Sequence, residues 1–408
     1  MTRHVVIVGA GHGGVSLCAA LRTLDFAGTI TLLSDEGDLP YHRPPLSKAF
    51  LTNQTPEADN KLLLEPQRFY DDKRIDLRLN TRVSTVDTMA QTLQLADGTV
   101  VPYDVLVLAT GARARTLALP GSELDGILVL RTLEQARNLR QRLVNSQSVA
   151  IVGGGFIGLE IASTARKLGK QVTVLETASR IMERSVSPEV STYVTRKHRE
   201  QGITLELDST VSAFVGDDGR VTAVRTETGE WPADLVIVGA GSLPNSELAE
   251  AAGITCANGI QVDSQMRTSA ANVFAIGDCV AFENRAANNA RLRLESIQNA
   301  NDQARLVARL IVGEDADYDA LPWFWSDQGQ IKLQMVGLSI GRTHCVIRGE
   351  PEHDRFSVFH YRDAILIAVD SVNQPLEHIL SRKLLAAGIS PDPARIIDTG
   401  IALKNLLD

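Results

Sequence analysis

The sequence predicts an α/β protein with two parallel-sheet domains of the same construction, followed by an α+β domain at the C-terminal end. The first observation is an internal repeat: strand, glycine turn, helix and strand occur twice, and Gly9 of the first copy matches Gly153 of the second. The second is a further apolar strand that runs into glycine after each copy. The third is a change near residue 320 to tryptophans and short β-like runs.

The first copy starts at the N-terminus. Its strand His4–Val8 leads into the turn Gly9–Gly14, a helical pattern extends to about Asp25, and a second strand covers Thr29–Leu33. These strands are unbroken runs rich in Val, Ile and Leu, which is typical of parallel sheets that are covered on both faces.

The second copy repeats this order with strand Val149–Val152, turn Gly153–Gly158 and strand Gln171–Leu175. The later apolar strands lie within Tyr103–Gly111 for the first copy and Ala233–Gly241 for the second. Each copy therefore predicts a complete Rossmann-like unit.

The positions of these copies predict three domains. The first is made of residues 1–112 and 240–318, and the second is inserted into it as residues 113–239. The α+β domain covers residues 319–408 and contains β-like runs such as Ala364–Val369.

Composition excludes several classes of protein. The 408 residues carry 41 Lys and Arg against 49 Asp and Glu, a net charge of −8, so no general attraction to nucleic acid or anionic membrane is expected. No signal-peptide core or membrane span is recognisable, which predicts a soluble cytoplasmic protein. The eight histidines show no metal-binding spacing. The four cysteines form no CxxC pair, so a redox dithiol is disfavoured: Cys18, Cys256, Cys279 and Cys345.

Both turns follow the GxGxxG pattern of dinucleotide-binding sites. The first glycine permits the bend, the second lets backbone amides approach a pyrophosphate, and the third allows close packing of the helix. Two such turns in strand–helix–strand context predict two dinucleotide sites. Their glycines are Gly9, Gly11, Gly13 and Gly14 in the first copy, and Gly153, Gly155 and Gly158 in the second.

An acidic residue after the second strand of each copy indicates which nucleotide is accepted. Glu176 can accept hydrogen bonds from ribose hydroxyls and repel a 2′-phosphate, which favours NADH over NADPH. Arg180 and Arg184 follow closely, and either could instead reach a phosphate. In the first copy we choose Asp35 for the adenosine ribose.

Two dinucleotide sites predict FAD together with NAD, because a nicotinamide carries two electrons as hydride and an isoalloxazine can release them singly. The segment Asn272–Cys279 supports this prediction, since a strand there runs into Gly-Asp and the Asp278 carboxylate could bind a ribityl hydroxyl. A simple turn aspartate is the alternative.

Taken in order, several motifs resemble those of flavoprotein NADH:ferredoxin reductases in the glutathione-reductase superfamily, a group that includes putidaredoxin reductase and the reductase components of Rieske dioxygenases. The matches span nearly the whole chain. They are Leu39–Lys48, Ala109–Gly111, Gly153–Glu160, Ile276–Cys279, Leu294–Ser296 and Trp323–Gln328.

The resemblance implies a set of site residues. Those expected to contact FAD are Asp35, Lys48, Val83, Arg131, Asp278 and Ile297. Those expected around NAD are Gly155, Glu160, Glu176, Arg184, Gly241, Glu295 and Trp325.

Four residues are expected to serve the hydride step itself. Lys48 would stabilise an anionic reduced flavin, and Glu160 and Glu295 would position the nicotinamide carboxamide. Trp325 could stack beside the flavin or simply fill a domain interface. Phe156 could cover the flavin and swing aside for nicotinamide, with burial in the core as the alternative.

The resemblance further implies that electrons pass to a 2Fe–2S ferredoxin that feeds a cytochrome P450 or a Rieske dioxygenase. An acidic ferredoxin would need local positive charge, and Arg305 and Arg309 share one face of a helix predicted over Ser296–Leu310. A solvated helix face paired with acids is the alternative for these arginines. The remaining functional alternatives are a rubredoxin reductase and a signalling flavoprotein of the apoptosis-inducing type.

Overall fold

The computed structural model describes residues 3–53, 55 and 59–407. They form two compact units, each assembled from three stretches of chain. Unit 1 comprises Met1–His42, Asp59–Arg113 and Leu243–Pro322; unit 2 comprises Arg43–Ala58, Ala114–Ser242 and Trp323–Asp408. Strands β8 (Ala112–Ala114) and β17 (Ser242–Pro244) lie where the chain passes from one unit to the other.

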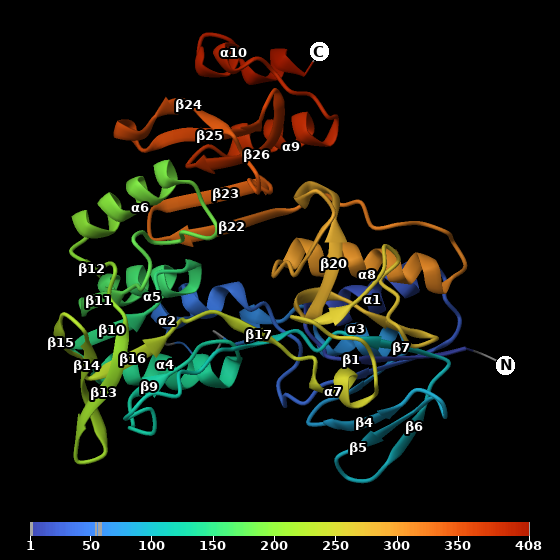
Figure 1. Cartoon of the computed structure of the whole chain (residues 1–408). Helices are drawn as coiled ribbons and strands as arrows, with labels where there is room; N and C mark the ends of the chain where they lie inside the picture. Colours follow the sequence, from blue (N-terminus) through green and yellow to red (C-terminus); the bar gives the residue numbers. More distant parts are fainter. Residues whose placement is uncertain (1–2, 54, 56–58, 408) are drawn as a thin grey trace. The chain divides into compact units, whose positions relative to one another are not determined.

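Unit 1 is built on a five-stranded parallel sheet with the strand order β19-β7-β1-β2-β3. Strands β1 and β7 of this sheet are labelled in Figure 1. After His4 its central strand β1 is apolar, and Val5, Val6 and Ile7 are completely buried. The sheet strands are β1 (His4–Val8), β2 (Thr29–Leu33), β3 (Ile75–Arg78), β7 (Val105–Leu108) and β19 (Val273–Ala275).

Helices α1 (His12–Thr23) and α8 (Ile297–Ile311) pack against each other in unit 1. Ser296 caps α8 by accepting a hydrogen bond from the Asn299 amide at 3.0 Å, so the helix begins where the sequence predicted. The remaining elements are α3 (Gln67–Asp72), α7 (Glu247–Ala251), β4 (Val83–Asp87), β5 (Thr92–Leu95), β6 (Val100–Pro102), β18 (Ile260–Gln261), β20 (Val280–Asn284), β21 (Ala290–Leu292) and short 3-10 turns including η4 (Gly277–Cys279).

Unit 2 contains the second parallel sheet, ordered β12-β11-β10-β16-β9. Its strands are β9 (Ile127–Leu128), β10 (Ser148–Val152), β11 (Gln171–Leu175), β12 (Thr204–Glu206) and β16 (Leu235–Val238). The accompanying elements are η1 (Pro44–Ser47), α2 (Ala49–Thr52), α4 (Leu133–Asn145), α5 (Phe156–Lys167), α6 (Pro188–Glu200), β13 (Val211–Asp217), β14 (Arg220–Thr226) and β15 (Gly229–Pro232).

The C-terminal part of unit 2 is an antiparallel sheet ordered β22-β23-β26-β25-β24 with helices α9 (Pro375–Ala386) and α10 (Pro393–Ile397) (Figure 1). Its strands are β22 (Trp323–Gln328), β23 (Ile331–Gly337), β24 (His344–Glu350), β25 (Arg355–Arg362) and β26 (Ile365–Val372). The predicted fold class, two Rossmann-like parallel-sheet domains and a C-terminal α+β domain, is confirmed. The predicted three-domain boundaries stay a prediction.

The internal repeat reappears as matching geometry at the carboxyl edge of each sheet. The Gly9 amide donates to the Leu33 carbonyl at 2.9 Å, and the Gly153 amide donates to the Leu175 carbonyl at 2.8 Å. Both glycine turns therefore leave their first strand in the same way. No helix among residues 3–53, 55 and 59–407 is long and apolar enough to cross a bilayer.

Candidate functional site

In the glycine turn of unit 1, the first and last glycines have no room for a side chain, whereas the second glycine has open space around it. Gly9 has φ +113°, and a Cβ there would lie 2.2 Å from the Ala109 carbonyl oxygen. A Cβ on Gly14 would lie 2.1 Å from the Gly9 carbonyl oxygen. A Cβ on Gly11 would meet nothing within 4 Å. The turn thus leaves space beside its second glycine, where a pyrophosphate would approach the backbone.

Unit 2 repeats this arrangement. Gly153 has φ +111°, and a Cβ there would lie 2.5 Å from the Gly239 carbonyl oxygen. A Cβ on Gly158 would lie 2.3 Å from the Gly153 carbonyl oxygen. Gly155 has open space around its Cβ position. Gly11 and Gly155 are the N-cap residues of α1 and α5, and no side chain caps either helix. The first backbone amides of both helices are therefore available to bind an anion. The described residues of both turns fit a dinucleotide.

Glu176 lies at the end of β11, beside the second turn. Its Oε2 accepts a hydrogen bond from the Gly154 amide at 2.6 Å, and its Oε1 accepts one from the Ala178 amide at 2.8 Å. Arg180 donates to the carbonyls of Val186 at 2.9 Å and Glu183 at 2.6 Å, which ties its guanidinium into its own loop. The carboxylate is therefore the group fixed at the turn.

The corresponding place in unit 1 is occupied by Ser34. Its amide bonds the Arg78 carbonyl at 2.9 Å, as the Glu176 amide bonds the Glu206 carbonyl at 2.9 Å. Asp35 is one residue further along and exposed. The sequence did not resolve this offset of one residue, and the assignment of Asp35 to the ribose stays a prediction.

Asp278 lies in η4, directly after Gly277, whose backbone has a positive φ and is held by a hydrogen bond. Gly277 has φ +81°, and its amide donates to Gln303 Oε1 at 2.7 Å. Gln303 Nε2 in turn donates to Asn299 Oδ1 at 3.3 Å, and both amide side chains are fully buried. These two residues of α8 hold the Gly-Asp turn in place, a role that the sequence analysis missed. Their signal was a spacing of four residues among the mostly apolar residues that α8 buries.

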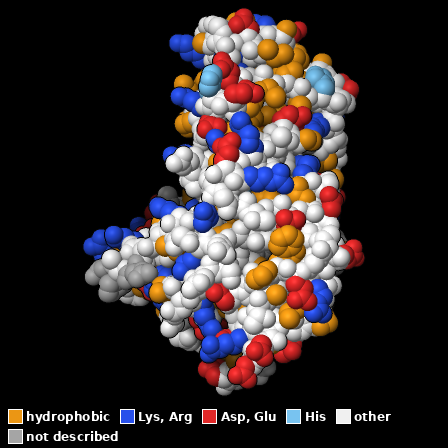
Figure 2. Space-filling model, turned by 90° about the vertical axis from the view of Figure 1, so that its left-hand side faces the viewer, with side chains coloured by type: hydrophobic (Ala, Val, Ile, Leu, Met, Phe, Trp, Pro, Cys, Tyr) orange, Lys and Arg blue, Asp and Glu red, His pale blue; other side chains and the backbone are white. Residues whose placement is uncertain are grey.

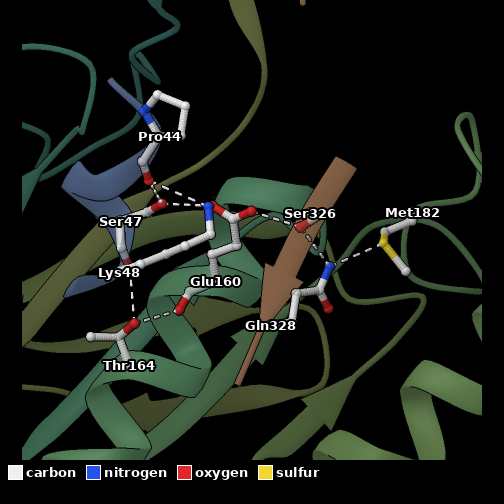
Figure 3. Close-up of polar contacts among 8 residues, drawn as sticks. All are labelled: Pro44, Ser47, Lys48, Glu160, Thr164, Met182, Ser326 and Gln328. Carbon is white, nitrogen blue, oxygen red and sulfur yellow. Dashed lines mark hydrogen bonds and ion pairs between the residues drawn. The ribbon is translucent and has the colours of Figure 1, made fainter. Parts of the chain in front are cut away.

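Lys48 and Glu160, predicted separately, meet in unit 2 (Figure 3). Lys48 Nζ lies 2.7 Å from Glu160 Oε2, and the Ser47 hydroxyl donates to the same oxygen at 2.6 Å. Ser326 of β22 donates to Glu160 Oε1 at 2.7 Å. The Glu160 side chain is only 3% exposed, so these donors offset the cost of burying its charge.

Aromatic side chains gather on both faces of β22. The Phe156 and Phe324 ring centroids lie 4.9 Å apart, and the Trp323 and Trp325 centroids lie 5.6 Å apart. Arg382 lies over the Trp323 ring at 4.6 Å. Phe156, at the start of α5, is half-buried against Phe324, so it is neither core nor freely exposed.

Two family models of known proteins match this chain. Residues 3–304 match the family model described as pyridine nucleotide-disulphide oxidoreductase. The chain belongs to this family. Residues 323–407 match a second model, described as reductase C-terminal. The resemblance seen in the motifs is confirmed, as are the predictions of an oxidoreductase and of FAD and NAD as its cofactors.

Similar proteins of this family cover the whole chain. Rhodocoxin reductase from Rhodococcus erythropolis is 42% identical over 401 residues, 98% of this chain and 93% of the relative. Putidaredoxin reductase from Pseudomonas putida is 39% identical over 410 residues, 99% of this chain and 96% of the relative. The solved ferredoxin reductase for the CYP199A2 system from Rhodopseudomonas palustris is 43% identical, with a TM-score of 0.97 and 100% of each chain covered.

A second solved structure is the covalent putidaredoxin reductase–putidaredoxin complex. It matches with a TM-score of 0.95 and 38% identity, covering 99% of this chain and 98% of that chain.

The four cysteines of the present chain are free, and Cys18 and Cys279 are buried.

The predicted site residues are distributed over both units. Val83, Asp278, Glu295 and Ile297 belong to unit 1, whereas Lys48, Arg131, Glu160, Gly241 and Trp325 belong to unit 2. Glu295 forms an ion pair with Arg293. The carbonyl of Arg131 accepts from Arg43 Nη1 at 2.9 Å. Arg184 is exposed.

Charged side chains on the face drawn in Figure 2 are interspersed rather than separated by sign. On α6, Lys197 pairs with Asp354 at 2.9 Å and with Glu200 at 2.9 Å. Lys197 holds the pKa of the Asp354 carboxyl below its usual range. Within this basic stretch of α6, Arg196–Arg199, His198 is fully buried, so only part of the stretch is a solvated helix face paired with acids.

Proposed function

We propose that this chain takes hydride from NADH onto bound FAD and passes electrons singly to a 2Fe–2S ferredoxin, which feeds a cytochrome P450 or a Rieske dioxygenase. The observation that carries the proposal is the duplicated glycine turn, open at Gly11 and again at Gly155. Two such turns suit a flavin dinucleotide and a nicotinamide dinucleotide in one chain. Bound FAD would supply the conversion from electron pairs to single electrons.

The proposal assigns FAD to the glycine turn of unit 1 and NADH to the glycine turn of unit 2, with further residues from both units. The residues assigned to FAD are Gly9, Gly11, Gly13, Gly14, Asp35, Lys48, Val83, Arg131, Asp278 and Ile297. The residues assigned to NADH are Gly153, Gly155, Phe156, Gly158, Glu160, Glu176, Arg184, Gly241, Glu295 and Trp325.

The chain's own residues then have distinct tasks. Glu176, fixed by the Gly154 amide, accepts from the adenosine ribose and repels a 2′-phosphate. Lys48 is 21% exposed and its Nζ lies 2.7 Å from Glu160 Oε2, so its ammonium group is held where it can stabilise negative charge on a ring that receives hydride. Phe156 and Trp325 exclude water. The rate comes from orientation and dry surroundings, and no acid–base group is required.

The partner would dock by local positive charge, with Arg305 and Arg309 of α8 as the assigned residues. Support comes from their spacing of one helical turn and their exposed side chains, 63% and 49% accessible. Each pairs with an acid, Asp302 and Glu314, and such exposed pairs are weak enough to be exchanged for a partner's carboxylates. We assign the protein to the cytoplasm, with neither nucleic acid nor membrane as partner.

A direct experiment tests this function. The purified protein should be yellow with one non-covalent FAD, and NADH should bleach it rapidly and support reduction of a 2Fe–2S ferredoxin. Recovery of FMN, or fast NADH oxidation with no ferredoxin from a broad panel reduced, would contradict the proposal.

Rubredoxin reduction is the second candidate, because a rubredoxin-NAD(+) reductase from Pseudomonas putida is 41% identical over 372 residues, 91% of this chain and 96% of the relative. Parallel turnover with a rubredoxin distinguishes the two acceptors. The apoptosis-inducing type of flavoprotein would show no rapid turnover with either acceptor.

A further inference from the structure

A chain of buried hydrogen bonds leads to Glu160 from α6 and β22. His198 Nε2 lies 2.8 Å from Gln328 Oε1, and Gln328 Nε2 donates to the Ser326 hydroxyl at 3.3 Å. Ser326 donates to Glu160 Oε1 at 2.7 Å (Figure 3). His198, Gln328 and Ser326 are fully buried. This chain therefore connects the C-terminal sheet with the carboxylate of α5.

The donors in this chain all point toward Glu160. Gln328 Oε1 can only accept, so His198 Nε2 carries the hydrogen; burial lowers the pKa of His198 and keeps the ring neutral. Because Gln328 Nε2 donates to the Ser326 oxygen, the single hydroxyl hydrogen of Ser326 is left for Glu160. Such chains polarise one another and strengthen the last bond.

The hydrogen bond from Ser326 determines which lone-pair positions of the Glu160 carboxylate remain for another donor. A carboxylate offers about four lone-pair positions. Oε2 uses two of them for Lys48 and Ser47, and Oε1 uses one for Ser326. Among the described residues no further donor contacts Oε1, so one position on it remains, and its direction depends on the rotation that Ser326 sets together with Lys48 and Ser47, because the terminal torsion of Glu is otherwise broad.

We infer that Ser326, oriented by Gln328, is a positioning residue that fixes the Glu160 carboxylate so that Oε1 selects an amide donor, the carboxamide NH2 of the nicotinamide. The inference rests on the proposed function, which assigns Glu160 to the nicotinamide. It gives the C-terminal sheet a part in hydride transfer through one hydroxyl. Ser326 touches neither substrate nor flavin in this role and acts through Glu160.

The test compares two hydride donors: NADH and reduced 3-acetylpyridine adenine dinucleotide, in which a methyl group replaces the carboxamide NH2. The measured quantity is the ratio of their second-order rate constants for flavin reduction under anaerobic stopped flow. We expect Ser326→Ala to shrink the preference for NADH by about five-fold, the value of one ordinary hydrogen bond. Ser326→Thr retains the hydroxyl and should retain the preference.

Ser357 offers a matched control in the same C-terminal sheet. It is fully buried and donates to Glu377 Oε2 at 2.7 Å, and Glu377 is itself paired with Arg348 at 2.9 Å. Ser357→Ala removes a hydroxyl–carboxylate bond from a fully buried serine elsewhere in the sheet, so the donor ratio should stay at the wild-type value. Flavin content and melting temperature accompany each variant.

The outcomes separate the inference from the function beneath it. A Ser326→Ala protein that slows both donors equally has only lost stability, which overturns the inference. If Glu160→Gln leaves the ratio unchanged, the assignment of Glu160 to the nicotinamide fails and the inference falls with it. If Glu160→Gln changes the ratio but Ser326→Ala does not, only the inference fails.

A further variant keeps the test decisive should Ser326→Ala not retain FAD. Gln328→Met removes the donor to Ser326 while leaving the hydroxyl itself, and it should shift the ratio in the same direction by a smaller factor. An unchanged ratio in Gln328→Met, with Ser326→Thr also at the wild-type value, overturns the inference in that case.

Discussion

The Gly154 amide donates to Glu176 Oε2 at 2.6 Å, so the carboxylate is fastened to the glycine turn beside it. A flexible surface glutamate could be displaced by a 2′-phosphate, but this one is held by a second amide, that of Ala178 at 2.8 Å. The negative charge therefore stays where a nucleotide ribose would bind. If Glu176 contacts the ribose as proposed, this fixed position predicts a preference for NADH over NADPH.

We expect Glu176→Arg to reduce the preference for NADH over NADPH by about ten-fold or more, because the variant loses the ribose contact and gains attraction for phosphate. The change should appear mostly in KM in steady-state kinetics with both nucleotides. Glu183→Arg, a reversal of an exposed acid in the same loop, serves as the control. Equal efficiency of the wild-type protein with NADPH would show that Arg180 or Arg184 dominates.

Local patterns explain why so much of this site could be predicted from sequence. Both glycine turns depend on residues within a few positions of each other, and the apolar strands around Gly9 and Gly153 define the sheets without further information. Glu160 is different. Its donors Ser47 and Ser326 come from segments far apart in sequence, and nothing in either segment marks a hydroxyl as a partner.

Residue-level precision at strand ends also required the structure. The equivalent of Glu176 in unit 1 is Ser34, and the acid follows one residue later, because hydrogen bonds to the neighbouring strand fix which residue ends the sheet. Gln303 and Asn299 were missed for a related reason: a buried amide on a helix has a partner that only the fold reveals.

The open space at Gly11 gives a prediction about cofactor retention. Gly11→Ala should fold normally, because a Cβ there meets nothing within 4 Å, yet the methyl group would obstruct a pyrophosphate. FAD affinity should fall by about ten-fold or more, equal to about 1.4 kcal/mol. Fluorescence titration of the apoprotein with FAD measures this loss.

Two other glycines provide the comparison for Gly11→Ala. Gly155→Ala should weaken NADH binding while FAD is retained, since it alters only the second turn. Gly14→Ala should lower the melting temperature, because its Cβ would lie 2.1 Å from the Gly9 carbonyl oxygen. Unchanged FAD affinity in Gly11→Ala would remove the pyrophosphate from this turn.

The buried pair His360–Asp370 predicts how stability depends on pH. Burial opposes charging of the imidazole, but Asp370 at 2.9 Å outweighs it and raises the pKa of His360 from 6.5 to about 9. Cys345 adds to this effect, and Arg342, near Nδ1, opposes it. The pair's stabilisation is complete below about pH 6.5, the value in the unfolded chain, and is lost as pH rises through about 9.

Hydrogen exchange of the β25 and β26 amides should therefore report local stability that falls by a few kcal/mol between pH 6.5 and 9. His360→Gln should flatten this dependence. His353→Gln, which alters an exposed histidine paired with Glu350, should leave it intact. A slope that persists in His360→Gln would assign the pH dependence to another group.

Docking of the acceptor gives the last prediction, and it starts from a conflict of charge. A protein with a net charge of −8 repels an acidic ferredoxin at long range, so docking through the exposed arginines of α8, as proposed, would depend on local charge. Arg305→Glu should lower the ferredoxin-dependent rate by about ten-fold or more at low salt, with ferricyanide reduction as the reference. Asp302→Asn frees Arg305 from its 2.7 Å ion pair and should raise the rate.

Two comparisons distinguish docking on α8 from a general effect of net charge: the dependence of the rate on salt, and the position of the substituted arginine. Near 1 M salt the Debye length is about 3 Å, so the difference between Arg305→Glu and the wild-type protein should shrink. Arg285→Glu makes the same charge change at another exposed residue of unit 1, whose side chain is 79% accessible and paired with Asp319. Equal losses in both variants would mean that total charge alone governs the encounter, and a loss confined to Arg305→Glu would locate the docking surface on α8.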